Sequence, residues 1–304
     1  MTGAATASPR HIWIDGRLAP ADVPHLSAFD RGFQLGDGVF ETLRARAGRP
    51  TEIDAHLARL RSSAEGLGIP LPRSIEKDVA AGITRLLEAE DLAGPTGDAA
   101  IRVTVSRGAF FGRGLLPPAD AEPKPTVVVQ AWPVTPPPPG HVERGLRLVT
   151  SEVRRDPSSP LGSLKTTSRA DHVYARLEAK RAGADDALFL TVNGHLSEAT
   201  TANIFLIRGT SLATPALACG ILAGTTRDWI LGWAAHVGLD AAEALLLPGD
   251  LASADEAFLS SSVAGVLPIA SFDGRAVGSG KPGRWTLRAR ADREAFIESP
   301  GAGT

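Results

Sequence analysis

GSLKTTSRADHVYARLEAKRAGADDALFLTVNGHLSEATTANIFLI, residues 162–207, decides the fold, because it predicts a helix followed by two strands. Near-helical spacing in its first half predicts an amphipathic helix with three inward positions, Val173, Leu177 and Ala182. The apolar runs Ala187–Val192 and Asn203–Ile207 then flank an Asn193-Gly194 turn, which predicts a hairpin. A helix leading into strands is typical of an α/β fold.

Lys165 and Glu198 are the residues of this stretch that suggest chemistry. Lys165 precedes hydroxylated residues, of which Thr167 or Ser168 is expected to cap the helix, and Glu198 falls between the turn and the second strand. An amine that can hold an aldehyde and an acid that can keep a ring nitrogen protonated are the minimum for an imine-forming cofactor. By spacing alone a solvated charge is the commoner role of such a lysine, so both interpretations stay open.

Composition narrows the class of protein. The 304 residues contain 32 Lys plus Arg against 34 Asp plus Glu, and no basic stripe with interleaved aromatics predicts nucleic-acid binding. Cys219 is the single cysteine, which excludes an intrachain disulfide and a Cys-rich metal site. The sequence has neither a signal-peptide pattern nor an apolar run of membrane-spanning length. We expect a soluble, cytoplasmic protein with no metal, membrane or nucleic-acid partner.

A proline tract divides the chain. Thr135-Pro136-Pro137-Pro138-Pro139-Gly140 favours a stiff polyproline II connector that cannot join a central strand. We therefore expect an N-terminal domain over 1–132, a linker over 133–140 and a C-terminal domain over 141–304. Before the tract, residue patterns predict a hairpin at 11–18, strands at 39–45, 101–105 and 126–131, and helices at 53–67 and 74–92.

Two polar clusters of the second half suggest an anion site. Gly224-Thr225-Thr226 opens a predicted helix and offers free backbone N–H groups, two hydroxyls and the positive end of a helix dipole. Ser260-Ser261-Ser262 ends a predicted strand, where hydroxyl runs can form turns or bind phosphate oxygens. An ordinary capped helix and an ordinary turn are the alternatives at this point.

Five sequence blocks in this order resemble the class IV pyridoxal-phosphate-dependent aminotransferases, of fold type IV. They are DRGFQLGDGVFETLR, HLARL, the lysine segment, LSEATTANIFLI followed by GILAGTTR, and FLSSSVAGVLPI. The resemblance covers nearly the whole chain. It implies a smaller N-terminal α/β domain, a larger C-terminal α/β domain with a pseudo-barrel, the cofactor pyridoxal 5′-phosphate, and a homodimer.

The resemblance also implies roles for individual residues. Lys165 matches the lysine that forms the Schiff base with the cofactor and moves the substrate proton. Glu198 matches the carboxylate that pairs with the pyridine nitrogen, and Arg59, in HLARL, matches the arginine that binds the cofactor phosphate. The remaining expected cofactor-binding residues are Thr201, Asn203, Leu222, Thr225, Thr226, Ser261 and Ser262.

Departures from the family patterns concern the substrate. D-Amino acid aminotransferases have a tyrosine where this chain has Phe33, and branched-chain aminotransferases have one where it has Ala170. SRGAFFGRG resembles a loop of aminodeoxychorismate lyases, so Arg107 or Arg113 is expected to bind a substrate carboxylate.

The resemblance therefore implies a transaminase that moves an amino group between a D-amino acid or (R)-amine and a 2-oxo acid. The alternatives are an aminodeoxychorismate lyase, which releases pyruvate and 4-aminobenzoate, and a branched-chain amino acid aminotransferase. A non-catalytic cofactor-binding relative would need a broken set of cofactor residues, whereas Arg59, Lys165 and Glu198 are all in place.

Overall fold

The computed structural model describes residues 8–118, 120–121 and 124–299 and divides into two compact units. The first unit takes the chain up to Thr135, together with Leu164–Arg169 and the end of the chain from Ile297. The second unit consists of Pro136–Ser163 and Ala170–Phe296. The boundary falls in the proline tract, where the linker is expected. However, the chain returns to the first unit at Leu164, so Lys165 belongs to that unit and not to the C-terminal domain in which we expected it.

The first unit is built on a six-stranded antiparallel sheet in the order β2-β1-β6-β5-β3-β4. Its strands are β1 (His11–Ile14), β2 (Arg17–Pro20), β3 (Gly38–Arg46), β4 (Arg49–Pro50), β5 (Asp98–Ser106) and β6 (Thr126–Pro133). The helices are α1 (Arg31–Leu35), α2 (Ile53–Gly66) and α3 (Ile75–Ala89). The predicted hairpin, strands and two long helices are confirmed, while the glycine-rich loop before β3 also contains the short helix α1.

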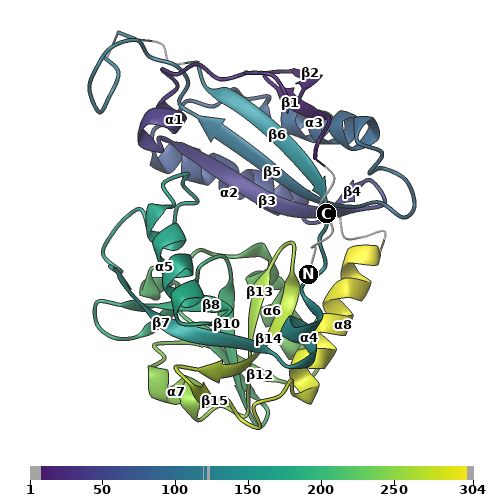
Figure 1. Ribbon diagram of the computed structural model, residues 1–304, viewed down its shortest axis with the longest axis vertical. Coiled ribbons are helices and arrows are strands. Elements are labelled where there is room, and N and C mark those ends of the chain that lie inside the picture. Colours follow the sequence, from purple (N-terminus) through teal and green to yellow (C-terminus); the bar gives the residue numbers. More distant parts are fainter. Residues whose placement is uncertain (1–7, 119, 122–123, 300–304) are drawn as a thin grey trace. The chain divides into compact units, whose positions relative to one another are not determined.

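Helices α2 and α3 cover one face of this sheet (Figure 1). Side chains alternate along β3, so Val39, Leu43 and Ala45 enter the core beneath these helices. Gly82 of α3 lies against Trp13 of β1, since an added Cβ would be 2.6 Å from the indole ring. Because side chains alternate along β3, its even-numbered residues lie on the opposite face of the sheet.

The second unit contains a nine-stranded mixed sheet in the order β12-β11-β10-β13-β14-β7-β8-β9, with β15 paired to β14. The strands are β7 (Leu146–Arg155), β8 (Asp186–Thr191), β9 (Leu196–Ala199), β10 (Asn203–Arg208), β11 (Ser211–Pro215), β12 (Asp240–Ala244), β13 (Glu256–Ser261), β14 (Gly265–Phe272) and β15 (Arg275–Ala276). The sheet curls, so that β9 at its end also contacts β10 and β11. This arrangement confirms the expected mixed α/β fold.

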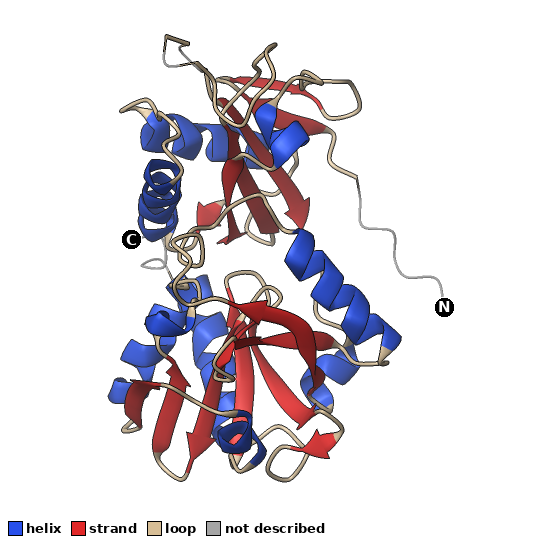
Figure 2. Ribbon diagram, turned by 90° about the vertical axis from the view of Figure 1, so that its left-hand side faces the viewer, coloured by secondary structure: helices blue, strands red, loops and turns tan. Residues whose placement is uncertain are grey.

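Helices pack around the strands of the second unit, as the blue and red ribbons of Figure 2 show. They are α4 (Pro139–Glu143), α5 (Ala170–Arg181), α6 (Thr225–His236), α7 (Pro248–Ala252) and α8 (Arg284–Glu298), with a 3-10 turn at Leu217–Cys219. The last two residues of α8 belong to the first unit. Among the described residues, no helix combines the length and the apolar character that crossing a bilayer requires.

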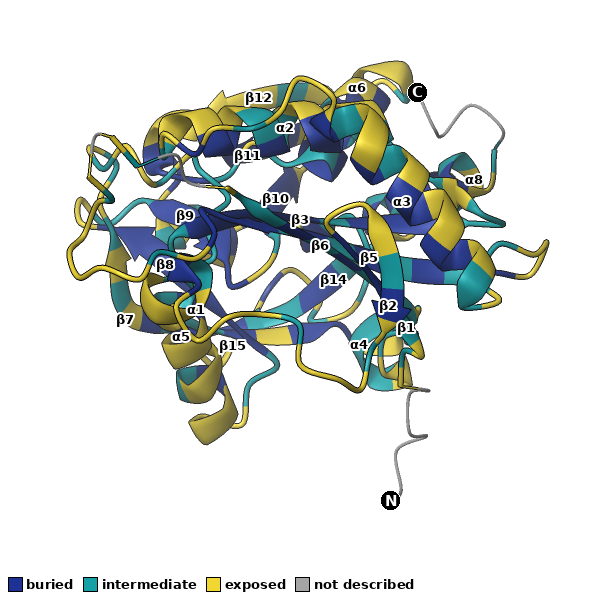
Figure 3. Ribbon diagram, turned by 90° about the horizontal axis from the view of Figure 1, so that it is seen from above, coloured by how far each residue is buried: buried dark blue, intermediate teal, exposed yellow. Residues whose placement is uncertain are grey.

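Helix α5 buries a different face from the expected one. His172, Ala175 and Ala179 are buried, whereas Val173 and Leu177 are exposed, and Figure 3 shows much of α5 in yellow. Small alanine side chains allow the helix to lie close to Phe189 of the sheet, so they form its inner face despite their weaker hydrophobicity. The predicted inward face of this helix is therefore wrong.

Two further local predictions in the central stretch are also wrong. The hydroxyls of Thr167 and Ser168 both donate to the carbonyl of Gly36, so these side chains tie the chain to the first unit instead of capping α5. Glu198 lies within β9, a separate short strand, and not in a loop before the second strand.

Candidate active site

Lys165 is held along the edge of β3. Its backbone carbonyl accepts from the amide of Phe40 at 3.0 Å, and its own amide donates to Ser63 Oγ at 3.1 Å. Thr167 N donates to the carbonyl of Gly38 at 2.8 Å, and Val39 pairs with Thr166 in an isolated bridge. The lysine segment thus continues the sheet beside β3, which fixes the direction of the lysine side chain.

Three cationic groups surround the ring of Phe40. Lys165 Nζ lies 4.8 Å from the ring centroid, and the guanidinium carbons of Arg102 and Arg169 lie at 3.9 and 5.7 Å. Burial lowers the pKa of the Arg102 guanidinium. Within the described part of the chain no carboxylate pairs with Arg102; its side chain donates to Thr104 Oγ1 at 3.1 Å. A partly buried guanidinium against the same ring as the lysine is suited to bind an anionic substrate group.

Arg59, the expected phosphate-binding residue, is oriented by a buried carboxylate. Its Nε and NH2 donate to the two oxygens of Glu41, each at 2.7 Å, and His56 Nδ1 lies 2.7 Å from the same carboxylate. Burial by itself would raise the pKa of Glu41, but the hydrogen bonds from Arg59 and His56 outweigh it and bring the pKa to about 2. Glu41 is therefore charged at neutral pH and holds the guanidinium in one orientation.

Glu198 and Asn203 of the second unit hold the backbone of Leu222 from two sides. Glu198 Oε2 accepts from the Leu222 amide at 3.1 Å, while Asn203 Nδ2 donates to the Leu222 carbonyl at 3.0 Å. Glu198 Oε1 accepts from Arg155 NH2 at 3.0 Å. The structure thus brings Glu198, Asn203 and Leu222 together, as expected. It gives Asn203 a positioning contact to Leu222, where we had expected direct cofactor binding.

The N-terminus of α6 lies beside the serine run. Gly224 precedes the helix without a side-chain cap, and Thr225 Oγ1 lies 3.4 Å from Ser262 Oγ. A Cβ at Gly224 would lie 2.2 Å from Asn203 Oδ1, so a larger residue would displace the Asn203 side chain or the helix start. Thr226, also expected here, is buried in the first turn of α6. The N-terminus of α6 and the two neighbouring hydroxyls form an arrangement suited to a phosphate group.

Thr201 and Ser261 line a different part of the second unit. Both border a cavity of about 160 Å³, whose other polar neighbours include Asp186, Arg176 and Ser260. Burial raises the pKa of Asp186, although Arg176 and Thr200 act in the opposite direction. The residues that line this cavity do not include Glu198, Leu222 or Thr225.

The three expected substrate residues have different surroundings in the first unit. Arg107 donates to both oxygens of Asp37, at 2.8 and 3.0 Å, and to the carbonyls of Leu67 and Gly68. Its guanidinium is held in place by these four hydrogen bonds, although it shares Asp37 with Arg31. Phe33 and Arg113 are exposed, on α1 and in the loop after β5.

These residues fit pyridoxal phosphate, the cofactor that the resemblance implies. In the second unit, the start of α6 with Thr225 and Ser262 suits a phosphate and the buried Glu198 suits a protonated ring nitrogen, while in the first unit Lys165 has the amine that an aldehyde needs. Sequence reasoning missed Arg102, Arg155 and Glu41. Arg102 lies on the face of β5 opposite the buried Ile101 and Val103, where alternation makes a charge ordinary, so no local signal identified it.

Comparisons with known proteins identify the family of the chain. The family model for amino-transferase class IV matches residues 38–272. The chain is 33% identical over 280 residues to a putative branched-chain-amino-acid aminotransferase of Methanocaldococcus jannaschii, covering 92% of this chain and 93% of the relative. It is 28% identical over 298 residues to a D-alanine aminotransferase of Bacillus licheniformis, covering 96% and 99%.

A solved structure shows the same fold. The crystal structure of 4-amino-4-deoxychorismate lyase from Pseudomonas aeruginosa matches with a TM-score of 0.80 and 31% identity, covering 95% of this chain and all of the lyase chain (100%). The similarity therefore extends over both units.

Proposed function

This chain belongs to the pyridoxal-phosphate-dependent class IV aminotransferase family, and we propose that it transfers an amino group between a D-amino acid and a 2-oxo acid. The observation that carries the choice of substrate class is Arg102. This guanidinium shares the ring of Phe40 with Lys165, and no described carboxylate pairs with it. Amino acids and 2-oxo acids both bring a carboxylate, which would complete the charge pair, whereas a simple amine would not.

The chain's own residues have separate tasks in this proposal. The bound cofactor supplies an aldehyde that carries the amino group and a ring that withdraws electrons from the substrate. Lys165 Nζ holds the aldehyde and moves the proton of the substrate α-carbon. Glu198 holds a proton at the ring nitrogen. Arg59 has the charge to bind the phosphate, and Glu41 keeps Arg59 in position.

The proposed configuration of the substrate depends on residue identities. Ala170 stands where branched-chain aminotransferases have a tyrosine, which disfavours the branched-chain alternative. Phe33 cannot donate a hydrogen bond, which disfavours a strict D-alanine enzyme. We therefore propose a relaxed range of D-amino acids, with (R)-amines as poorer donors because they leave Arg102 without an anion.

The lyase is the second candidate, and two observations favour it. The loop SRGAFFGRG resembles that of aminodeoxychorismate lyases, and a solved lyase shares 31% identity with this chain. The side chain of Arg107 in that loop is hydrogen-bonded to Asp37. In this alternative, the exposed Arg113 is therefore the arginine of the loop that would bind a substrate carboxylate.

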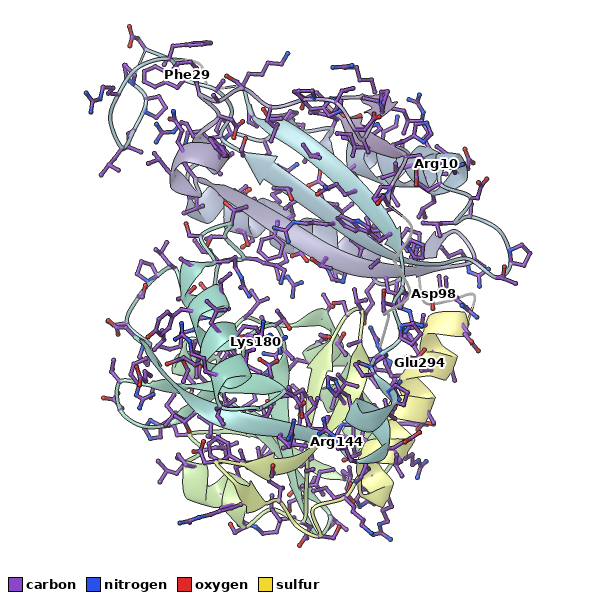
Figure 4. All side chains as sticks on the ribbon, viewed as in Figure 1. Arg10, Phe29, Asp98, Arg144, Lys180 and Glu294 are labelled. Carbon is purple, nitrogen blue, oxygen red and sulfur yellow. The ribbon has the colours of Figure 1, made fainter. Side chains whose placement is uncertain are left out.

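We also propose a homodimer in the cytoplasm. Four apolar side chains around α1 and the loop after β5 are strongly exposed in the first unit: Phe33 (75%), Phe111 (77%), Leu115 (80%) and Leu116 (72%). Phe29, labelled in Figure 4, packs against Phe111 at a ring distance of 4.9 Å. A second copy would remove this apolar surface from water. Sedimentation equilibrium tests the dimer, since a monomer would contradict this proposal.

The proposed cytoplasmic location rests on Cys219, because a single cysteine cannot form an intrachain disulfide and is compatible with a reducing compartment.

One substrate panel tests the function. Wild-type holoenzyme is assayed with D- and L-amino acids, (R)-amines and aminodeoxychorismate, with and without a 2-oxo acid. We expect turnover of D-amino acids that requires the 2-oxo acid. Preference for branched L-amino acids would identify a branched-chain enzyme, and pyruvate release without an acceptor would identify the lyase.

Variants of Arg102 test whether this guanidinium binds the substrate carboxylate. Arg102→Gln should raise the KM for the 2-oxo acid about tenfold, the loss expected for one charged hydrogen bond. Arg102→Lys keeps the charge and should lose less. Equal KM values in all three proteins would contradict the role of Arg102.

A further inference from the structure

A hydrogen-bonded chain of four side chains leads from the surface of α5 to Glu198. Asp171 Oδ1 lies 2.5 Å from His172 Nδ1, and His172 Nε2 lies 2.8 Å from Arg155 NH2. The same NH2 group lies 3.0 Å from Glu198 Oε1, and Arg155 NH1 lies 3.2 Å from Asp171 Oδ2. Arg155 NH2 therefore points one hydrogen at the imidazole and the other at the carboxylate.

The contact between His172 and Arg155 specifies how the imidazole is protonated. A guanidinium nitrogen can only donate, so His172 Nε2 must accept, and the proton of the neutral ring lies on Nδ1. Asp171 Oδ1 accepts the hydrogen bond from this Nδ1–H group. Burial alone would raise the pKa of Asp171, but chiefly the hydrogen bond from His172 lowers it below its usual range. Asp171 thus stays an acceptor and selects the tautomer.

A buried aromatic ring keeps these groups in place. Phe189 of β8 is fully buried, and the guanidinium carbon of Arg155 lies 4.8 Å from its centroid. The His172 ring stands edge-on to the same phenyl group, at 5.3 Å and 74°. Arg155 and His172 are therefore fixed against one rigid surface as well as against each other.

The charges of these four side chains indicate which further group the cluster favours. Asp171 and Glu198 bring two negative charges and Arg155 one positive charge, while His172 is neutral in this arrangement. The cluster thus favours one further cation, and a protonated ring nitrogen of the cofactor at Glu198 would supply it. The hydrogen bond from Arg155 NH2 at 3.0 Å holds Glu198 Oε1, so the carboxylate is kept in one orientation.

Resting on the function proposed above, we propose that His172 is a positioning residue for this site. It holds Arg155 on Glu198 and thereby keeps the ring nitrogen of the cofactor protonated. His172 touches neither the substrate nor the cofactor in this role, and its effect passes through Arg155.

Two variants at one position test the proposal. Holoenzymes with pyridoxal phosphate labelled with ¹⁵N in the ring are prepared from wild type, His172→Leu and His172→Gln. Leucine removes the acceptor, whereas the glutamine oxygen can take the place of Nε2. For His172→Leu we expect the ¹⁵N signal to move toward neutral pyridine and kcat to fall about tenfold with KM unchanged. His172→Gln should restore both. A wild-type signal in His172→Leu, or equal losses in both variants, would overturn the proposal.

Two controls separate its failure from other causes. If His172→Leu does not fold, Asp171→Ala at the partly exposed end frees the other tautomer and should shift the signal in the same direction; no shift there counts against the proposal. Glu198→Gln distinguishes failure of the role proposed for Glu198 from failure of the role proposed for His172. If it leaves the ¹⁵N signal unchanged, the assignment of Glu198 fails. If it moves the signal while His172→Leu does not, only the role of His172 fails.

Discussion

Glu41 and Arg59 form a two-point ion pair in the first unit, with both carboxylate oxygens 2.7 Å from guanidinium nitrogens. Glu41 is completely buried on β3, and Arg59 lies on α2 with a side chain 14% exposed. The strand thereby sets the orientation of the arginine that we assign to the cofactor phosphate. A buried charge of this kind is stable because both of its oxygens have cationic or imidazole partners.

Stability should fall in acid through Glu41. Its pKa is about 2 in the folded protein against 4.5 for the free side chain, so the pair stabilises the fold above pH 4.5. This contribution, about 3 kcal/mol, is lost as the pH falls from 4.5 toward 2. Urea unfolding at several pH values measures it. Glu41→Gln should be less stable at pH 7 and show a flatter pH dependence in this window; identical slopes would contradict the assignment.

Lys165→Ala should abolish covalent retention of the cofactor. Borohydride reduction of wild-type holoenzyme should leave the cofactor attached to the chain, and denaturing mass spectrometry detects it. The variant should release it, and kcat should fall by about a thousandfold or more, because the amine also moves the substrate proton. Lys180→Ala, at the exposed lysine of α5 labelled in Figure 4, serves as the control and should retain the cofactor. Retention in Lys165→Ala would disprove the assignment.

Glu198→Gln should bind cofactor but turn over slowly. The amide cannot balance a protonated ring nitrogen, so we expect kcat to fall about a hundredfold with cofactor affinity nearly retained. Single-turnover kinetics with a D-amino acid measure the step. The amide keeps one acceptor oxygen, so it can retain the hydrogen bond from Arg155 or the one from the Leu222 amide, but not both. Wild-type turnover would show that Glu198 does not hold the ring nitrogen.

Gly224→Ala should weaken cofactor binding, because the new methyl group would lie 2.2 Å from Asn203 Oδ1 and displace either the start of α6 or the contact to Leu222. We expect the Kd for the cofactor to rise at least about tenfold, which corresponds to 1.4 kcal/mol. Gly232→Ala in the same helix meets nothing within 4 Å and is the matched control. It should bind normally and gain about 1 kcal/mol in stability. Similar affinities of the two variants would contradict this account of Gly224.

Local patterns predicted many elements but not every face. The spacing of Leu57, Leu60 and Ala64 identified α2 and its buried side, because that helix packs its largest apolar residues on a sheet. The same reasoning chose the wrong side of α5, where Ala175 and Ala179 are buried. Helical periodicity reports where large side chains recur, but the available depth beneath a helix depends on the partner element.

By itself, the sequence determined the elements, the glycine turns, the lysine and carboxylate of the proposed site, and the family. These follow from short-range spacing or from residues in a recognisable order. The tertiary structure alone decided which side chains complete the site: Glu41 with Arg59, Arg155 with Glu198, and Arg102 beside Lys165. These partners are brought together by strand register and helix packing between distant parts of the chain, which no local pattern encodes.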